Sequence, residues 1–154
     1  MEFKFFDNIN KGPIEFDPAR TSARKNTMRV VLVEPGKVAR IVDIEATLRG
    51  MQQAVRGRIE AVYPFKEPVC LVCNEEGKLN RMPLNRAIKH DGKISEIIAG
   101  PFFVCAFDEY DFCGLTLEQQ RKYLEVFRRP EYFFHFDGKV AVIPYDPQKE
   151  TESR

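Results

Sequence analysis

The stretch RVVLVEPGKVARIVDI, residues 29–44, decides the fold of this chain. It contains an apolar run at 30–33, a turn at 34–37 and a second apolar run at 38–44. β-Branched residues favour strands, and Pro followed by Gly favours a turn. The stretch therefore predicts two consecutive strands that pair antiparallel, and the rest of the chain can be interpreted outward from this hairpin.

Gly-Lys turns recur along the chain. Besides Pro35-Gly36-Lys37, the same pair occurs in Glu76-Gly77-Lys78, Asp91-Gly92-Lys93 and Asp137-Gly138-Lys139. A phosphate-binding loop is excluded at all four, because it needs a second Gly five residues earlier and Ser or Thr after the Lys. Each turn instead predicts a hairpin with Lys at the start of the returning strand.

Two segments have helical features. Leu48, Met51 and Val55 recur at helical spacing and predict a helix over about 46–56, which Gly57 ends. A Thr-x-x-Gln capping box at 116–119 begins a second helix, running to about 128. The other expected elements are strands at 59–63, 69–73, 102–107, 132–136 and 139–143 and a short helical turn at 84–89. These elements predict an α+β domain with two principal helices and a mainly antiparallel sheet of about five or more strands.

Length and charge limit the classes of protein. A chain of 154 residues has room for one domain, expected at 29–146, after a lead segment (1–28) and before a disordered tail (147–154). Apolar residues at Phe3, Phe5, Phe6, Ile14 and Phe16 can add a strand or hairpin in the lead segment. A net charge of +1 argues against a strongly basic nucleic-acid binder and against an acidic nucleic-acid mimic. No apolar run is long enough for a membrane span or signal peptide, so a cytoplasmic protein without membrane contact is expected.

Four cysteines raise the question of a metal or redox site. Cys70 and Cys73 have the spacing of a redox pair or of half a zinc site, but they lie in an expected strand. Strand alternation puts them on opposite faces, about 10 Å apart, whereas a disulfide needs Cα atoms within about 7 Å. We therefore expect no disulfide between them, no metal, no cofactor and structural thiols, with zinc and redox roles as the alternatives.

A polar segment, residues 73–86, differs most from a generic surface. It reads CNEEGKLNRMPLNR and carries two Asn-Arg pairs on either side of Pro83. Amide and guanidinium groups supply several directed hydrogen bonds, which serve either a ligand or the backbone. Five residues are expected to form one polar cluster at an edge of the sheet, as a ligand-binding site or as a structural cap: Asn74, Glu76, Lys78, Asn85 and Arg86.

The order of these features resembles the uncharacterised DUF3846 family, over about residues 29–128. The matching motifs are Val33-Glu34-Pro35-Gly36-Lys37, Leu48-x-x-Met51-Gln52, Gly57-x-Ile59-Glu60, Cys73–Lys78, Pro83–Arg86, Gly100–Val104 and Leu115-Thr116. The resemblance implies an accessory protein of bacterial phages, plasmids or conjugative elements. It supplies no catalytic residues, so none is assigned.

Three functions follow from these patterns. The leading interpretation is a non-enzymatic binding protein that acts on a host protein, an element protein or a small ligand. A nucleic-acid-binding protein is the second, through the basic segment Arg20–Arg29 with Arg81 and Arg86. The third is a hydrolase-like enzyme that uses carboxylates of Glu75, Glu76, Asp108 or Glu109 beside Arg86.

Overall fold

Three of the four Gly-Lys turns join paired strands. The computed structural model describes residues 26–148. Gly36, Gly92 and Gly138 have positive φ angles of 73°, 78° and 70°, and each lies in the turn of an antiparallel hairpin. Gly77 instead lies in a long connection between two strands that belong to different sheets. The prediction of a hairpin at Gly77 is therefore wrong.

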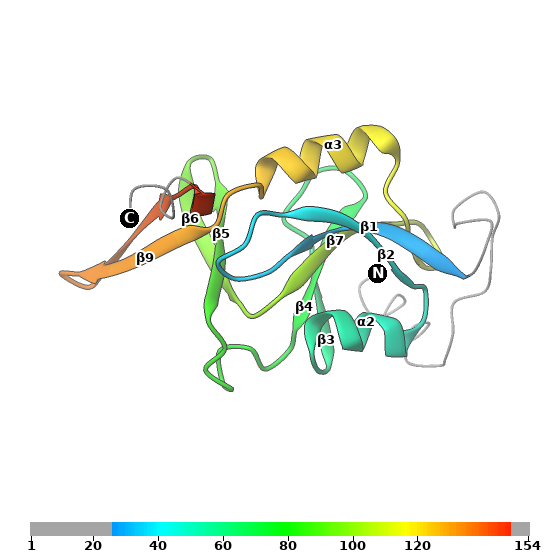
Figure 1. Cartoon of the computed structure of the whole chain (residues 1–154), viewed down its shortest axis with the longest axis horizontal. Coiled ribbons are helices and arrows are strands. Elements are labelled where there is room, and N and C mark those ends of the chain that lie inside the picture. The colour runs from blue at the N-terminus through cyan, green and yellow to red at the C-terminus, as the bar shows by residue number, and fades with distance from the viewer. Residues whose placement is uncertain (1–25, 149–154) are drawn as a thin grey trace.

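Ten strands and two helices form the described part of the chain (Figure 1). They are β1 (Thr27–Val33), β2 (Arg40–Glu45), α2 (Leu48–Val55), β3 (Ile59–Val62), β4 (Val69–Asn74), β5 (Leu84–His90), β6 (Lys93–Ala99), β7 (Phe102–Phe107), β8 (Phe112–Cys113), α3 (Leu117–Val126), β9 (Glu131–Phe136) and β10 (Lys139–Pro144). The main sheet has the order β2-β1-β7-β4-β3, with β8 beside β7, and every pair in it is antiparallel. The predicted α+β fold is thereby confirmed.

Each face of the main sheet has its own hydrophobic core. On one face, Met51 and Val55 of α2 pack against alternate residues of the sheet, among them Val30. On the other face, which α3 covers (Figure 1), Tyr123 of α3 and Phe127 at its end pack with sheet residues such as Phe102. Neighbouring strand residues point to opposite faces, so the apolar central strands supply both cores.

The cysteines follow the same alternation. Cys70 belongs to the core beneath α2 and Cys73 to the core beneath α3, as predicted from their spacing. The Sγ atom of Cys70 lies 3.8 Å from that of Cys105, its partner on β7, and both thiols are free. Burial raises the pKa of Cys105 well above its usual value, so this thiol stays protonated and contributes as an apolar side chain.

Both expected helices are present, and each starts at a capping residue, of which the capping box at Thr116 was predicted. Thr47 caps α2, and Thr116 with Gln119 forms both hydrogen bonds of the capping box at α3. The expected helical turn at 84–89 is wrong, because these residues form β5. Asn85 and Arg86 are buried in that strand, so its sequence lacks the apolar pattern of a buried strand.

The ends of the described chain differ from the expected domain limits in detail. Thr27 and Met28 fall within the expected lead segment, but they begin β1, and Met28 is fully buried. The expected strand or hairpin in residues 1–25 and most of the expected tail, 149–154, lie outside the described residues. Within 26–148, neither helix has the length and apolar content that crossing a membrane requires.

Candidate functional site

The five residues of the predicted polar cluster divide into two groups. Asn74, Glu76 and Lys78 line one hollow beside the edge strand β3. The side chains of Asn85 and Arg86 instead contact the backbone of β1, of the turn after it and of the end of α3. The two groups therefore have different roles.

Arg86 is a buried guanidinium whose hydrogen bonds go to the protein itself. Its Nε and Nη2 atoms donate to the carbonyl oxygen of Phe127, at 3.1 and 3.0 Å, and Nη2 also donates to the carbonyl of Lys37 at 2.7 Å. Its Nη1 atom donates to the backbone and side-chain oxygens of Asn85. These contacts equal the five N–H donors of a guanidinium, so its bonding capacity is used within the fold.

Asn85 completes this arrangement. Its amide nitrogen donates to the carbonyl oxygens of Val33 and Gly100, at 2.9 and 2.8 Å, while its Oδ1 atom accepts from Arg86. The pair thereby joins β5 to β1, to the turn between β6 and β7 and to the C-terminal end of α3. A cation near the carbonyl end of a helix is favourable, so the guanidinium of Arg86 stabilises α3 from its position at the C-cap residue Phe127.

The charge of Arg86 has no carboxylate within hydrogen-bonding distance among the described residues. Burial lowers the pKa of Arg86 to about 10. The negative charge of Glu131 acts in the opposite direction and raises it. The guanidinium is still charged at neutral pH. The Glu131 carboxylate itself accepts a hydrogen bond from the backbone amide of Ala87, at 2.8 Å.

Asn74 is likewise bonded to the backbone. Its Nδ2 atom donates to the carbonyls of Val55 and Arg56, which are left without helical partners where α2 ends, at 3.1 and 3.2 Å. Its Oδ1 atom accepts from the amide of Glu76 at 2.8 Å. Asn74 therefore caps α2 and also fixes the turn that carries Glu76.

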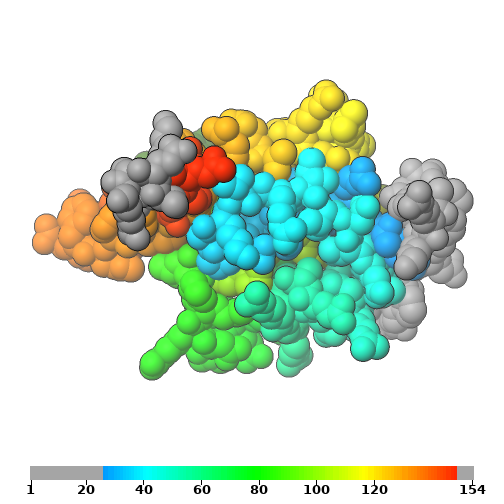
Figure 2. All heavy atoms as spheres, viewed as in Figure 1, coloured from blue at the N-terminus to red at the C-terminus, as the bar shows by residue number. Residues whose placement is uncertain are grey.

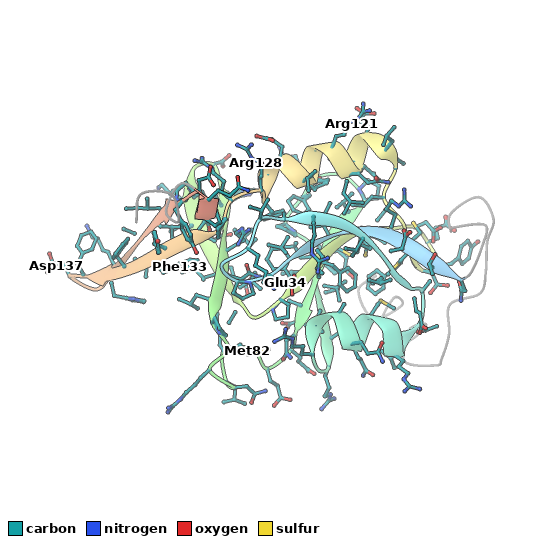
Figure 3. All side chains as sticks on the ribbon, in the orientation of Figure 1. Glu34, Met82, Arg121, Arg128, Phe133 and Asp137 are labelled. Atoms are coloured by element: carbon teal, nitrogen blue, oxygen red, sulfur yellow. The ribbon has the colours of Figure 1, made fainter. Side chains whose placement is uncertain are left out.

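The connection after β4 packs tightly against the end of β6 and the turn that follows it. A Cβ atom at Gly77 would lie 2.4 Å from the carbonyl oxygen of Ala99, and one at Gly100 would lie 2.7 Å from the sulfur of Met82, which Figure 3 labels. Gly77 is thus required for close approach. Gly100 is favoured by its φ of 82°, since the Met82 side chain beside it can shift.

This close approach leaves a hollow of about 300 Å³ between the connection and the end of β6. Its floor is apolar, with Cys73, Ile98 and Ala99 buried beneath it. Its exposed walls carry four carboxylates and one ammonium group, namely Glu60, Glu75, Glu76, Glu96 and Lys78. The hollow is therefore negatively charged over an apolar base.

The carboxylates interact with one another. The pKa of Glu60 is raised, first by partial burial and then by repulsion from Glu96 and Glu75. Glu75 also forms an ion pair with Arg58, with 3.3 Å between Oε2 and Nε. Glu60 and Glu96 were not predicted as site residues, because they reach the hollow from strands of different sheets and no local motif marks them.

The hollow is suited to binding a positively charged group. A cation would relieve the repulsion around Glu60, and the apolar floor suits the stem of a Lys or Arg side chain. The thiol of Cys73 cannot act as a nucleophile at neutral pH, because burial and the nearby carboxylates raise its pKa to about 12.

The carboxylates of the hydrolase-like alternative lie apart. Glu75 and Glu76 follow the end of β4 that pairs with Phe102, whereas Asp108 and Glu109 follow the other end of β7. Five residue steps of extended strand, about 16–17 Å, separate the two ends. Asp108 accepts hydrogen bonds from the amides of the next turn, at 2.8 and 3.0 Å.

The basic residues of the nucleic-acid alternative are also dispersed. Arg29 makes a two-bond contact with Asp43, which lowers the pKa of that carboxylate. Arg86 is buried and Arg81 is exposed on the β4–β5 connection. Arg20, Arg24 and Lys25 lie outside the described residues. No basic surface is assembled from the described members of this set.

Comparison with known proteins gives one result. Residues 28–128 match the family model described as "Domain of unknown function (DUF3846)". No curated protein and no solved structure matches the chain. The matched range contains the hollow and Arg86 and ends before β9.

Proposed function

We propose, from the premise that this chain belongs to the DUF3846 family over residues 28–128, that it is a non-enzymatic binding protein whose acidic hollow takes a Lys or Arg side chain of a partner protein. The observation that carries the proposal is the hollow itself, where Glu75 and Glu96 repel Glu60 above a buried apolar floor. The resemblance to proteins of mobile elements suggests that the partner is a protein of the bacterial host or of the element, met in the cytoplasm.

The charge balance of the hollow supports a cationic ligand. Four carboxylates surround it, against Lys78 on the rim and Arg58 paired with Glu75. Bringing a guanidinium among partly desolvated carboxylates gives charge-assisted hydrogen bonds, which are stronger than neutral ones. The closely packed connection at Gly77 and the Asn74 turn hold Glu76 in place before any ligand arrives.

The proposal is tested with the peptides Gly-Arg-Gly and Gly-citrulline-Gly, which have nearly the same shape but differ in charge. We expect the arginine peptide to shift the backbone amide signals of residues 60, 73–79 and 96–99 in NMR spectra, with millimolar affinity. The citrulline peptide should leave these signals unchanged. Equal shifts with both peptides, or no shift in these segments, would refute the proposed function.

Two variants with opposite expected effects sharpen the test. Glu60→Gln combined with Glu96→Gln should weaken binding of the arginine peptide about tenfold, and Lys78→Gln should strengthen it, because a cation leaves the rim. Glu109→Gln, an exposed carboxylate beyond β7, is the matched control and should bind as the unchanged protein does. Binding should also weaken as the pH falls, since Glu60 takes up a proton at higher pH than an ordinary glutamate.

A further inference from the structure

The hairpin of β9 and β10 projects from the domain as a separate two-stranded sheet (Figures 1 and 2). Within residues 26–148, no other strand pairs with either of its strands. An isolated two-stranded sheet is marginally stable in water by itself. The hairpin is therefore an element that gains stability when a surface covers it.

One face of this hairpin is apolar and exposed. The register pairs Tyr132 with Ile143, Phe134 with Ala141 and Phe136 with Lys139, so these six side chains share a face. Four of them are large and apolar, with exposed fractions of 37% for Tyr132, 48% for Phe134, 57% for Phe136 and 53% for Ile143. We name these six residues the aromatic face. Exposed apolar patches of this kind mark interaction sites.

The two ends of the aromatic face carry different groups. Lys139, its single charged residue, lies next to the turn at Asp137. At the other end, the ring of Tyr132 stacks on that of Tyr145, with centroids 3.9 Å apart and 15° between the ring planes. A cation is thus separated from a tyrosine pair by the length of the strands, with Phe134 halfway between.

We propose that the aromatic face is covered by the aromatic face of a second copy of this chain, in an antiparallel two-fold arrangement. The two-fold axis passes at Phe134, which meets its own counterpart. Tyr132 then lies on Phe136 of the second copy. Lys139 lies on Ile143 of the second copy, with its ammonium group directed at the stacked tyrosines there.

Charge selects this arrangement over the alternative two-fold. With both turns at the same end, each Lys139 would lie on Phe136 of the second copy, and both cations would share one end of the covered surface, which is unfavourable for like charges. The antiparallel arrangement places them at opposite ends. The face is thus complementary to itself in one orientation, which is the condition for a closed dimer.

The area of the face sets the strength of the dimer. Aromatic side chains cover 150–250 Å² each when fully buried, so the exposed fractions leave roughly 350 Å² per copy, or about 700 Å² in the pair. Stable interfaces bury about 1,200–2,000 Å². The proposed dimer is therefore weak and reversible, and forms in the micromolar concentration range.

The test is sedimentation velocity of the full chain over a range of micromolar concentrations. We expect a monomer that converts to a dimer as concentration rises, and a dissociation constant raised at least about tenfold in Phe134→Ser. Leu117→Ser is the matched control, because Leu117 is also an exposed apolar residue, at 61%, but lies at the start of α3. A thermal unfolding curve close to that of the unchanged protein shows that each variant is folded.

Cross-linking tests the symmetry of the contact. Packed sheets lie about 10 Å apart, so cysteines placed at the axis are within reach of a short bismaleimide. Ala141→Cys, which lies beside Phe134 at the axis, should give a covalent dimer with this reagent, whereas Leu117→Cys should not. A full chain that stays monomeric at every concentration overturns the proposal, whether the face is then covered by residues 1–25, by another protein or by nothing. A dimer that persists in Phe134→Ser overturns it as well.

Discussion

Replacing Arg86 with Met should destabilise the protein by about 3 kcal/mol. The Met side chain keeps much of the stem volume but removes every N–H group. The carbonyl oxygens of Phe127 and Lys37 then lose the partners that the structure gives them. Each buried oxygen left without a partner costs about 1–3 kcal/mol, or about 2–6 together, and part of this is offset because a charge no longer has to be desolvated.

The assay is urea unfolding followed by circular dichroism, with Arg81→Met as the matched control. Arg81 belongs to the other Asn-Arg pair of the same segment but is exposed, so its variant should change stability by less than about 0.5 kcal/mol. In thermal unfolding, the Arg86→Met midpoint should fall by about 6–12 °C for a chain of this size. Equal stability of the two variants would refute the view that Arg86 stabilises the fold through these bonds.

The pH dependence gives a second measurement on the same pair of proteins. The pKa of Arg86 is lowered from 12.5 to about 10 in the folded state, so its charge is constant in the neutral range. The stability difference between the unchanged protein and Arg86→Met should therefore be flat from weakly acidic to weakly alkaline pH. Above about pH 10 the unfolded chain binds more protons at this site than the folded chain, so the unchanged protein should gain stability relative to the variant.

Four further substitutions test other parts of the structure. Gly77→Ala should cost at least about 2 kcal/mol in urea unfolding, because its Cβ would lie 2.4 Å from the oxygen of Ala99. Gly92→Ala, with nothing within 4 Å, should cost only about 1 kcal/mol for its positive φ. Asn74→Asp should cost about 2 kcal/mol and speed amide hydrogen exchange in α2, because a carboxylate replaces a donor at the helix end. Glu60→Gln should stabilise the protein at neutral pH by less than about 1 kcal/mol, because the folded state raises the pKa of this exposed carboxylate.

Each of these expectations has a result that would contradict it. Equal losses in Gly77→Ala and Gly92→Ala would show that the connection can move away from Ala99. Unchanged hydrogen exchange in Asn74→Asp would mean that the stability of α2 does not depend on the hydrogen bonds from Asn74. The gain in Glu60→Gln should disappear as the pH falls below 4.5, the ordinary value for Glu, since both states are then protonated. A gain that persists there would have another origin.

The elements that could be predicted are those encoded by neighbouring residues. The turns at Gly36, Gly92 and Gly138 need a positive φ that Gly readily adopts, and the sequence shows this directly. The capping box at Thr116 is also local, because its two hydrogen bonds join residues three apart. These signals, with apolar alternation, were enough to predict an antiparallel α+β fold.

The strand β5 and the hollow could not be predicted, for a shared reason. Arg86 is buried because of the carbonyl of Phe127, which is 41 residues away, and Asn85 because of Val33, which is 52 residues away. Glu60 and Glu96 reach the hollow from different sheets. Sequence reasoning identified the segment 73–86 as unusual, but the partners that explain it become neighbours only after folding.

The hydrogen bond from the amide of Ala87 to Glu131 bears on how this chain relates to its family. The family match ends at residue 128, so the donor lies inside the shared domain and the acceptor lies in the hairpin that follows it. A version cut after residue 128 would leave this amide in β5 without its acceptor. The matched domain of this chain therefore uses a residue beyond the family match to satisfy one of its backbone amides. In a relative without such a hairpin, water or another acceptor must bind this amide. The end of the family match and the end of the folding unit therefore differ in this chain.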